Sequence, residues 1–197
     1  MKNILIIIPT YREEKNIFKL SEKLLNLNND NLNLKLFIVD DSDNLLSQNL
    51  LLNSKLRKKI IFIKRAKKSG RGSAVIKGMK YFLRNKNYFS CIVEMDADFS
   101  HNPGELKRNL NYFFSKKSDL LIASRYLNKS KIINWPISRK ILSFFSNKLA
   151  KFLLGVPVSD YTNGYRIYSY NAVNCCLKNC GKIGDGFIIL SEFLLSI

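Results

Sequence analysis

Short apolar runs alternate with segments of helical periodicity along the first 124 residues of this chain. The runs occupy residues 3–9, 34–39, 59–64, 89–95 and 119–124. Apolar runs of this length are typical of strands that are buried on both faces of a sheet. Between the first two runs, Ile17, Leu20, Leu24 and Leu27 recur at the spacing of an amphipathic helix. The alternation predicts an α/β fold, in which one mostly parallel sheet carries helices on both faces.

Polar residues gather where the predicted strands end. They occupy residues 9–13, 40–41, 68–72, 96–98 and 124–126. In a parallel sheet, ligands bind beyond the carboxyl ends of the strands. We therefore expect these segments to contribute to one ligand site.

Three segments carry signals for the start of a helix. Thr10 and Glu13 have the spacing of a capping box, with Thr10 as the N-cap and Glu13 at the third helical position. Gly70 and Gly72 predict a loop before the next helix. Pro103 predicts the start of another helix, because proline is favoured at the first helical position.

Residues 136–154 predict a basic amphipathic helix. Its apolar residues are Ile141, Leu142, Phe145, Leu149, Phe152 and Leu153, and its basic residues are Arg139, Lys140, Lys148 and Lys151. We interpret the apolar stripe as part of the core, with contact to a lipid surface as the alternative. Residues 159–168 predict a loop followed by a short strand. Because the sequence stops inside an apolar helix at residues 187–197, we expect a C-terminal segment to be missing.

The chain is strongly basic, with 33 Lys and Arg against 15 Asp and Glu and a formal net charge of +18. Such a charge favours a polyanionic partner: nucleic acid, anionic lipid or a phosphorylated substrate. The sequence shows no signal peptide and no apolar stretch of the roughly 18 residues that cross a bilayer. Its four cysteines lack the paired C-x-x-C spacing of a structural zinc site. We expect a cytoplasmic protein with reduced thiols.

Asp96 and Asp98 stand one residue apart at the end of the apolar run 89–95. Two carboxylates in this position are suited to one divalent ion, because Mg²⁺ and Mn²⁺ prefer oxygen ligands and retain waters or phosphate oxygens. A metal bound to a diphosphate would neutralise charge on the leaving group. The alternative is a pair of surface aspartates in a turn.

Two further segments predict contacts to a nucleotide. Asp40 and Asp41 follow the run 34–39, and ionised carboxylates accept hydrogen bonds from a base or ribose; a turn or helix cap is the alternative. Residues 67–72 form a basic glycine loop before a helix, where an anion is favoured. The loop fits neither the P-loop pattern nor a complete G-x-G-x-x-G, which argues against an ATPase or a dinucleotide-binding protein.

With these residues in place, the chain resembles the family-2 inverting glycosyltransferases of GT-A fold. Within that family it is most similar to the dolichol-phosphate mannose synthases and the bacterial polyprenyl-phosphate glycosyltransferases. The resemblance rests on residues 8–17, 39–42, 68–74, 95–103, 124–126 and 159–168, which occur in the family's order. It implies one GT-A catalytic domain over residues 1–197.

The resemblance also implies roles for individual residues. The donor nucleotide would be bound by Pro9, Tyr11, Glu13, Asp40, Asp41, Lys68 and Gly70. The residues nearest the chemistry would be Asp96, Asp98, Arg125 and Asp160, with Mg²⁺ or Mn²⁺ on Asp96 and Asp98. The acceptor phosphate would be held by Arg125, Arg139, Ser143 and Arg166.

The chain departs from the family pattern in three places. Ser100 stands at a position near the metal that is often glutamine, so a water would complete the shell. Arg71 replaces a leucine in the glycine loop, and one residue is inserted between Thr162 and Gly164. The insertion leaves the sugar specificity open.

The resemblance implies transfer of a hexose, mannose or glucose, from a GDP- or UDP-sugar to a polyprenyl phosphate with inversion. A phosphate monoester is mostly dianionic at neutral pH and needs no general base, whereas a hydroxyl acceptor does. The positive charge that brings two anionic substrates together would come from the metal and from Arg125, Arg139 and Lys140. We expect a peripheral protein at the cytoplasmic membrane face that does not bind nucleic acid.

Three alternatives stay open at this point. The first is a family-2 transferase that acts on the hydroxyl group of a polysaccharide or glycan. The second is a basic nucleic-acid-binding module, which the carboxylates at the strand ends oppose. The third is an inactive relative.

Overall fold

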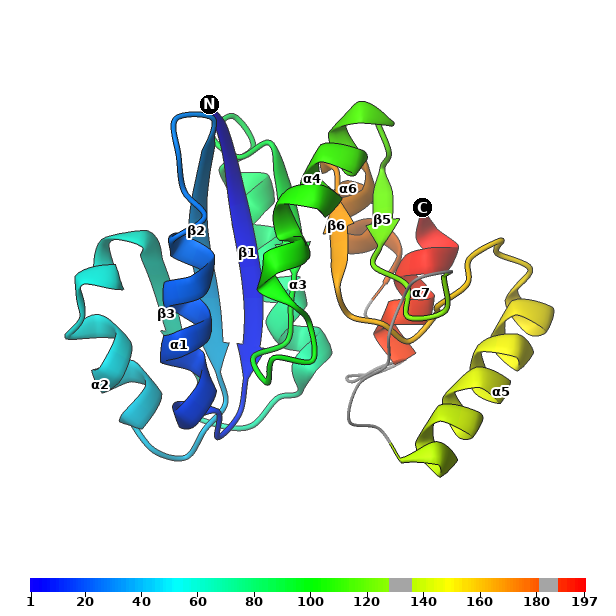
Figure 1. Ribbon diagram of the computed structural model, residues 1–197, viewed down its shortest axis with the longest axis horizontal. Coiled ribbons are helices and arrows are strands. Elements are labelled where there is room, and N and C mark those ends of the chain that lie inside the picture. Colours follow the sequence, from blue (N-terminus) through cyan, green and yellow to red (C-terminus); the bar gives the residue numbers. More distant parts are fainter. Residues whose placement is uncertain (128–135, 181–187) are drawn as a thin grey trace.

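The computed structural model describes residues 1–127, 136–180 and 188–197, without the side chains of Arg139 and Ile188. In this part of the chain, six strands form one sheet in the order β3-β2-β1-β4-β6-β5 (Figure 1). The strands are β1 (Lys2–Thr10), β2 (Leu32–Asp40), β3 (Ile60–Lys64), β4 (Cys91–Glu94), β5 (Leu120–Ile122) and β6 (Arg166–Tyr168). The first four are parallel, and β6 runs antiparallel to both of its neighbours. The predicted strands and the mostly parallel sheet are confirmed.

Helices cover both faces of the sheet, as expected (Figure 1). One face carries α1 (Glu14–Leu25), α2 (Leu46–Leu52) and α4 (Leu106–Ser115), with short 3₁₀ turns at Lys55–Lys59 and Pro103–Glu105. The other face carries α3 (Arg71–Arg84), α6 (Tyr170–Asn179) and α7 (Ile188–Ser196).

The central strand β1 explains why its run is apolar throughout. Ile4, Ile6 and Ile8 point into the core on the α1 side, and Leu5 and Ile7 point into the core on the α3 side. Successive side chains of a strand alternate between faces, so a strand covered on both sides must be apolar at every position.

Helix α3 packs unusually close to β1. A Cβ at Gly78 would lie 2.6 Å from Ile7 Cδ1, so only glycine permits this distance between helix and strand. The close packing fixes the N-terminus of α3 against the carboxyl ends of β1 and β4, beside the polar segments.

The predicted capping box at Thr10 is wrong. Thr10 is the last residue of β1, and α1 begins at Glu14 with Glu13 as its N-cap and no side-chain cap bond. The cause is the turn between them: Arg12 adopts φ 56°, and its backbone N–H donates to Ser42 Oγ at 2.8 Å. The chain therefore crosses the end of the sheet before the helix begins.

The two other helix starts are close to expectation. Gly70 is the N-cap of α3 with φ 81°, so Gly72 lies in the first turn of that helix rather than in the loop. Pro103 begins a 3₁₀ turn that leads into α4, and the Asn102 side chain caps it by accepting from Gly104 N–H.

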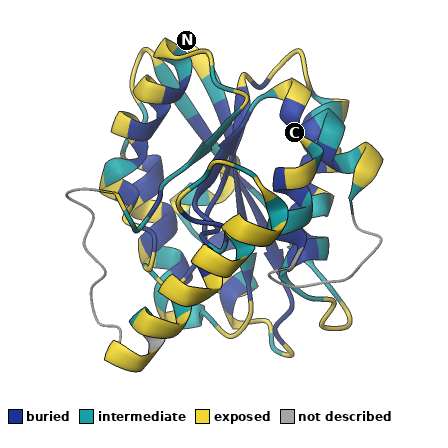
Figure 2. Cartoon of the chain, turned by 90° about the vertical axis from the view of Figure 1, so that its right-hand side faces the viewer, coloured by how far each residue is buried: buried dark blue, intermediate teal, exposed yellow. Residues whose placement is uncertain are grey.

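The helix predicted at residues 136–154 is present as α5 (Ile137–Leu154), but its interpretation as a core helix is wrong. Leu142, Phe145 and Phe152 are 69%, 61% and 84% exposed. The helix stands beside the sheet, not against it (Figures 1 and 2). Both faces of the sheet are already covered by other helices, so α5 has no core to enter.

Polar residues connect α5 to the rest of the chain. Tyr126 Oη donates to Ser143 Oγ at 2.6 Å. The buried Asn147 side chain accepts from the Tyr161 backbone N–H, also at 2.6 Å. These contacts leave the apolar side of α5 exposed. No helix in the described residues is long and apolar enough to cross a membrane.

Candidate active site

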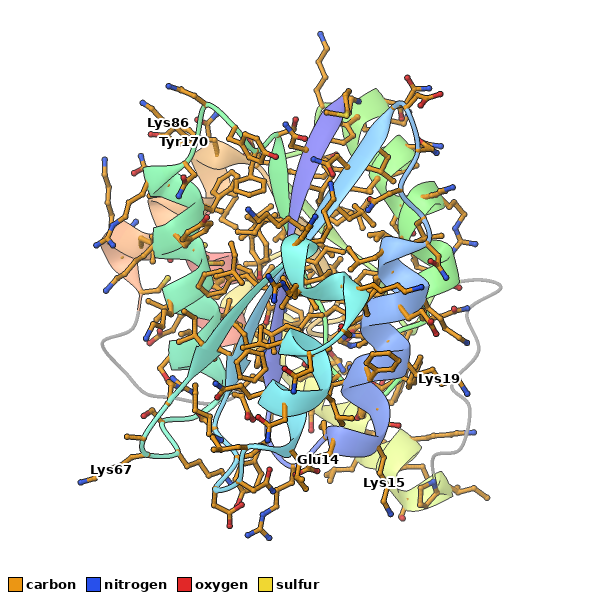
Figure 3. All side chains as sticks on the ribbon, turned by 90° about the vertical axis from the view of Figure 1, so that its left-hand side faces the viewer. Glu14, Lys15, Lys19, Lys67, Lys86 and Tyr170 are labelled. Carbon is orange, nitrogen blue, oxygen red and sulfur yellow. The ribbon has the colours of Figure 1, made fainter. Side chains whose placement is uncertain are left out.

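A pocket of about 310 Å³ lies at the carboxyl ends of the central strands, beside the N-terminus of α3. Its wall includes the predicted nucleotide-side residues Pro9, Tyr11, Glu13, Asp41, Lys68 and Gly70, and the predicted metal-side residues Asp96 and Asp98. Figure 3 shows the segments that carry Glu14 and Lys67 at this end of the sheet, with Lys86 and Tyr170 at the opposite end. The structure therefore brings together side chains from four separate strand ends.

Asp41 is held in place on the nucleotide side by an arginine that sequence reasoning missed. The Arg65 guanidinium forms a fork on the Asp41 carboxylate, with Nε on Oδ1 and Nη2 on Oδ2. The same guanidinium donates to Ser73 Oγ and Gly70 O, and Ser69 N–H donates to Asp41 Oδ2 at 3.1 Å. A bidentate pair of this kind fixes both side chains and the glycine loop. The signal in the sequence was a basic residue directly after a predicted strand.

Asp40 has a different environment from Asp41. It is fully buried, and its carboxylate accepts from Ser42 N–H and Ser42 Oγ, and from Lys64 Nζ at 3.2 Å. It does not line the pocket. These contacts stabilise the turn that presents Asp41.

Tyr11 and Lys68 lie together at the pocket wall. Lys68 Nζ is 3.9 Å from the centre of the Tyr11 ring, within the range of a cation–π contact. The Glu13 carboxylate nearby accepts from Asn16 Nδ2 at 2.7 Å. Aromatic, cationic and anionic groups thus surround the same opening.

The Asp96 carboxylate lies between Arg71 and His101. Arg71 Nε donates to Asp96 Oδ1 at 2.9 Å, and His101 Nε2 lies 3.7 Å from Asp96 Oδ2. The Asp96 backbone N–H donates to His101 Nδ1 at 2.9 Å, so the neutral ring carries its proton on Nε2. Burial lowers the pKa of His101. Burial raises the pKa of Asp96, but opposing interactions, led by the charge of Arg71 and including its hydrogen bond, outweigh it and lower that pKa overall.

Arg71 also contacts a buried glutamate that sequence reasoning missed. Arg71 Nη1 lies 2.5 Å from Glu94 Oε1, and Tyr168 Oη donates to Glu94 Oε2 at 2.9 Å. Burial lowers the pKa of the Arg71 guanidinium, but the charges of Glu94 and Asp96 outweigh it and raise that pKa. The signal for Glu94 was a charged residue inside an otherwise apolar run.

The oxygen donors of Asp96 and Asp98 fit a hard divalent cation. Both side chains line the pocket, and Asp98 Oδ1 accepts from Ser100 N–H at 2.9 Å. Within the described residues, no group of three or more His, Cys, Asp or Glu side chains is arranged to hold a metal. Two carboxylates leave coordination positions for waters and diphosphate oxygens, which is the usual way in which Mg²⁺ is bound with a nucleotide.

Arg125, which the sequence predicts to hold the acceptor phosphate, is brought together with Asp160 in the structure. Arg125 Nε donates to Asp160 Oδ2 at 2.8 Å, and Nη2 donates to Oδ1 at 2.7 Å. The guanidinium also donates to Thr162 Oγ1 at 2.7 Å. The charge of Arg125 contributes to the lowered pKa of Asp96, so this pair lies within electrostatic reach of the metal side.

The remaining predicted acceptor residues differ in position. Ser143 lies on α5 and contacts Tyr126, next to Arg125 in the chain. Arg166 is fully buried and donates to the backbone carbonyls of Asn163, Tyr161 and Leu190. It holds the loop before β6 together and is not turned toward a ligand. The side chain of Arg139 lies outside the described residues.

Comparisons with known proteins place these features in a family. Residues 5–177 match the family described as Glycosyl transferase family 2. A polyprenol monophosphomannose synthase of Mycolicibacterium smegmatis is 36% identical over 168 residues, which cover 83% of this chain and 60% of that protein. An undecaprenyl-phosphate mannosyltransferase of Micrococcus luteus is 39% identical over 104 residues, which cover 53% of this chain and 41% of that protein. The chain thus spans about three-fifths or less of these relatives.

The fold is similar to that of a solved glucosyl-3-phosphoglycerate synthase from Mycobacterium tuberculosis, in complex with Mn²⁺, uridine diphosphate and phosphoglyceric acid. The TM-score is 0.58 at 14% identity, over 88% of this chain and 58% of that one. At such low identity the likeness concerns the fold alone. It confirms the expected GT-A fold.

Proposed function

The chain belongs to glycosyl transferase family 2, and from that premise we propose that it transfers a hexose from a nucleotide-sugar to a polyprenyl phosphate. The observation that carries the proposal is the convergence of Asp41, after β2, with Asp96 and Asp98, after β4, on one pocket beside a basic loop. A nucleotide-sugar offers matching chemistry: hydroxyl and amide donors at one end and a diphosphate at the other.

The base and ribose of a nucleotide carry hydrogen-bond donors, and we assign Asp41 to accept from them. The Asp41 carboxylate, which pairs with Arg65, accepts hydrogen bonds and so selects N–H and O–H groups. Tyr11 and Lys68 offer an aromatic face and a positive charge at the wall. Pro9, Glu13 and Gly70 complete this side, and Asp40 acts through the turn that supports Asp41.

The metal side of the proposal assigns Mg²⁺ or Mn²⁺ to Asp96 and Asp98. Such an ion, when bound, neutralises charge on the diphosphate leaving group. The buried carboxylate of Glu94 adds negative charge below Asp96, and Arg71 offsets it. The neutral His101 orients the Asp96 backbone through its Nδ1 atom.

The acceptor is proposed to be a phosphate monoester because the site offers the Arg125 cation, and a phosphate dianion needs no general base. The phosphate oxygen attacks the anomeric carbon, the bond from that carbon to the diphosphate oxygen breaks, and the nucleoside diphosphate leaves. Attack from the opposite side inverts the configuration. We assign the acceptor phosphate to Arg125, which Asp160 holds by two hydrogen bonds, together with Lys140, Ser143 and Arg139. The dianion supplies its own nucleophilic oxygen at neutral pH.

The exposed apolar side of α5 supports the membrane part of the proposal. Leu142, Phe145 and Phe152 are exposed on a helix that also carries Lys140, Lys148 and Lys151. Helices of this composition lie in the interface of anionic membranes with their apolar side in the acyl region. The helix also carries Ser143, so the same element would present a lipid-linked phosphate to the site. We propose that the protein acts at the cytoplasmic membrane face.

A hydroxyl acceptor or a nucleic-acid partner has less support. Neither accounts for an apolar helix face beside the Arg125–Asp160 pair. RNA-binding sheets present exposed aromatic side chains, whereas the central strands in the described residues are buried on both faces.

The test combines donor binding and product analysis. GDP- and UDP-sugars, each with and without Mn²⁺, are screened by thermal shift, and stabilising donors are incubated with polyprenyl phosphate in detergent or vesicles. We expect one donor to raise the melting temperature only with the metal, and its sugar to appear on the lipid. Stabilisation without lipid glycosylation, but with transfer to a glycan, would favour the hydroxyl acceptor.

A further inference from the structure

We propose that Arg71 is a built-in cation that holds Asp96 before a divalent metal binds, and thereby makes metal binding depend on the nucleotide diphosphate. The proposal rests on the proposed function, because that function assigns Asp96 as a metal ligand. Arg71 is a positioning residue in this account: it acts through Asp96.

The position of Arg71 at the pocket floor is fixed from several sides. It is the first residue of α3, directly after Gly70 in its left-handed conformation. Its Nε lies 2.9 Å from Asp96 Oδ1, and its Nη1 lies 2.5 Å from Glu94 Oε1. Its side chain is only 13% exposed and lines the pocket.

Gly164 provides the room that the guanidinium needs. A Cβ at Gly164 would lie 1.9 Å from Arg71 Nη2 and 2.9 Å from Arg71 Cζ. No other residue fits at this position with Arg71 in place. Glycine at position 164 therefore allows the loop before β6 to pack directly against the Arg71 guanidinium.

The positive charge of Arg71 opposes the binding of a divalent metal ion to Asp96. One Asp96 oxygen already accepts from a guanidinium, which remains charged at every physiological pH. A divalent ion on the same carboxylate would be repelled by that charge at short range, and the guanidinium is only 13% exposed to solvent that could screen it. Asp96 alone is thus a poor metal ligand, although its side chain is 26% exposed to the pocket.

A nucleoside diphosphate in the pocket makes metal binding at Asp96 favourable. Its oxygens coordinate the metal and add negative charge near both cations, so the repulsion between metal and guanidinium is offset. Metal and nucleotide then bind with positive coupling, and each raises the affinity of the other by the same factor.

The experiment measures Mn²⁺ dissociation constants by electron paramagnetic resonance of the free ion, with and without GDP or UDP. The variants are Arg71→Gln and Arg71→Lys. A third, Arg71→Gln/Glu94→Gln, avoids an unpaired buried carboxylate and keeps a partner for Tyr168. Arg84→Gln removes the same charge from an exposed position on the same helix and is the matched control.

We expect Arg71→Gln to bind Mn²⁺ alone on the order of tenfold more tightly than the wild type, since tenfold corresponds to about 1.4 kcal/mol of relieved repulsion. The double variant should gain less, because it also loses the attraction of the Glu94 charge, but it should still bind more tightly than the wild type because Arg71 contacts Asp96 directly. In both variants, the gain in Mn²⁺ affinity from a nucleoside diphosphate should shrink. Arg71→Lys and Arg84→Gln should behave like the wild type.

An unchanged Mn²⁺ affinity in a double variant with a native circular dichroism spectrum would overturn the proposal. Loss of folding in that variant would also count against it, because it would make Arg71 a structural residue first. The metal-only measurement does not depend on which nucleotide, sugar or acceptor the protein uses. If Arg71→Gln bound Mn²⁺ more tightly but neither diphosphate tightened Mn²⁺ binding to the wild type, the repulsion by Arg71 would be upheld, whereas the coupling and the nucleotide part of the proposed function would be contradicted.

Discussion

The guanidinium of Arg125 donates hydrogen bonds to both carboxylate oxygens of Asp160, which lies 35 residues further along the chain, with N–O distances of 2.7 and 2.8 Å. Asp160 is fully buried and also accepts from the backbone N–H groups of Arg125 and Asn163. The segment after β5 and the loop before β6 are thus joined through one carboxylate. This pair fixes the position of Arg125 before any acceptor binds, which is the preorganisation that phosphate recognition requires.

Replacement of Asp160 by asparagine should destabilise the protein. The variant leaves Arg125 without its countercharge in a largely buried place, and loss of one partner of a buried ion pair costs about 3–5 kcal/mol. Arg125 retains some contact with solvent, so we expect a value near the lower limit. Urea denaturation measures the change. Asp43→Asn removes the carboxylate of the exposed pair with Arg12 and should leave the free energy of unfolding nearly unchanged.

The pH dependence of stability should reveal the same pair. Burial raises the pKa of Asp160, but the hydrogen bond and charge of Arg125 outweigh it, so the folded-state pKa lies below the value of about 3.8 that an unperturbed aspartate has. A depressed carboxyl pKa gives stability that is present above the unfolded value and is lost as the pH falls through the folded one. The wild type should therefore exceed Asp160→Asn in stability at pH 7, and this difference should shrink below pH 3.8. A constant difference across the titration would contradict the ionised pair.

Removal of the Asp98 carboxylate should abolish transfer and leave the fold intact. Asp98 is exposed at the pocket. Within the described residues, its carboxylate accepts one hydrogen bond, from Ser100 N–H. Loss of a group that stabilises charge at the leaving group lowers kcat by roughly 10²–10³-fold. Asp98→Ala should thus combine a near-normal melting temperature with loss of turnover and of Mn²⁺-dependent nucleotide binding. Near-normal turnover would exclude the metal role.

The sequence predicted the sheet and the pocket because both depend on local patterns. A strand buried on two faces must be apolar throughout, and polar residues at its carboxyl end must meet those of its neighbours. Asp96 and Asp98 could therefore be assigned to one site with Asp41 from the sequence alone, and all three line the pocket.

What the sequence did not reveal depends on contacts between distant segments. The fork of Arg65 on Asp41 and the burial of Glu94 beneath Arg71 arise from three-dimensional packing. The position of Arg166 within a cluster of backbone carbonyls is a further example. Periodicity likewise showed an apolar face on α5 but not which elements would already cover the sheet.

Substitution of Gly164 by alanine should displace Arg71. The new Cβ would lie 1.9 Å from Arg71 Nη2, so the guanidinium must leave its place between Glu94 and Asp96 or the loop must move. Overpacking of this kind costs about 1–3 kcal/mol. We expect a lower melting temperature and a change in Mn²⁺ affinity like that of Arg71→Gln. A Gly104→Ala variant is the control, because its Cβ meets only the Asn102 side chain, at 3.2 Å.

The exposed face of α5 should bind anionic membranes. Leu142 and Phe145 are 69% and 61% exposed, so their replacement by asparagine removes apolar area without opening a cavity. Each loses the roughly 1.5–3 kcal/mol that full burial of such a side chain provides. The double variant Leu142→Asn/Phe145→Asn should therefore fold normally and no longer float with vesicles that contain anionic lipid.

The matched control lies on the opposite side of the molecule. Leu46 and Leu50 on α2 are also exposed, and α2 lies far from α5 in Figure 1. Leu46→Asn/Leu50→Asn should float like the wild type, because α2 itself carries no Lys or Arg to hold an anionic surface. If the wild type fails to float, or if both double variants lose flotation equally, α5 is not the membrane-binding element. The α5 variant is also assayed for transfer to polyprenyl phosphate in vesicles and to a short-chain acceptor in solution. If only this variant loses flotation, and it loses transfer in vesicles but not in solution, membrane contact serves to deliver the lipid substrate.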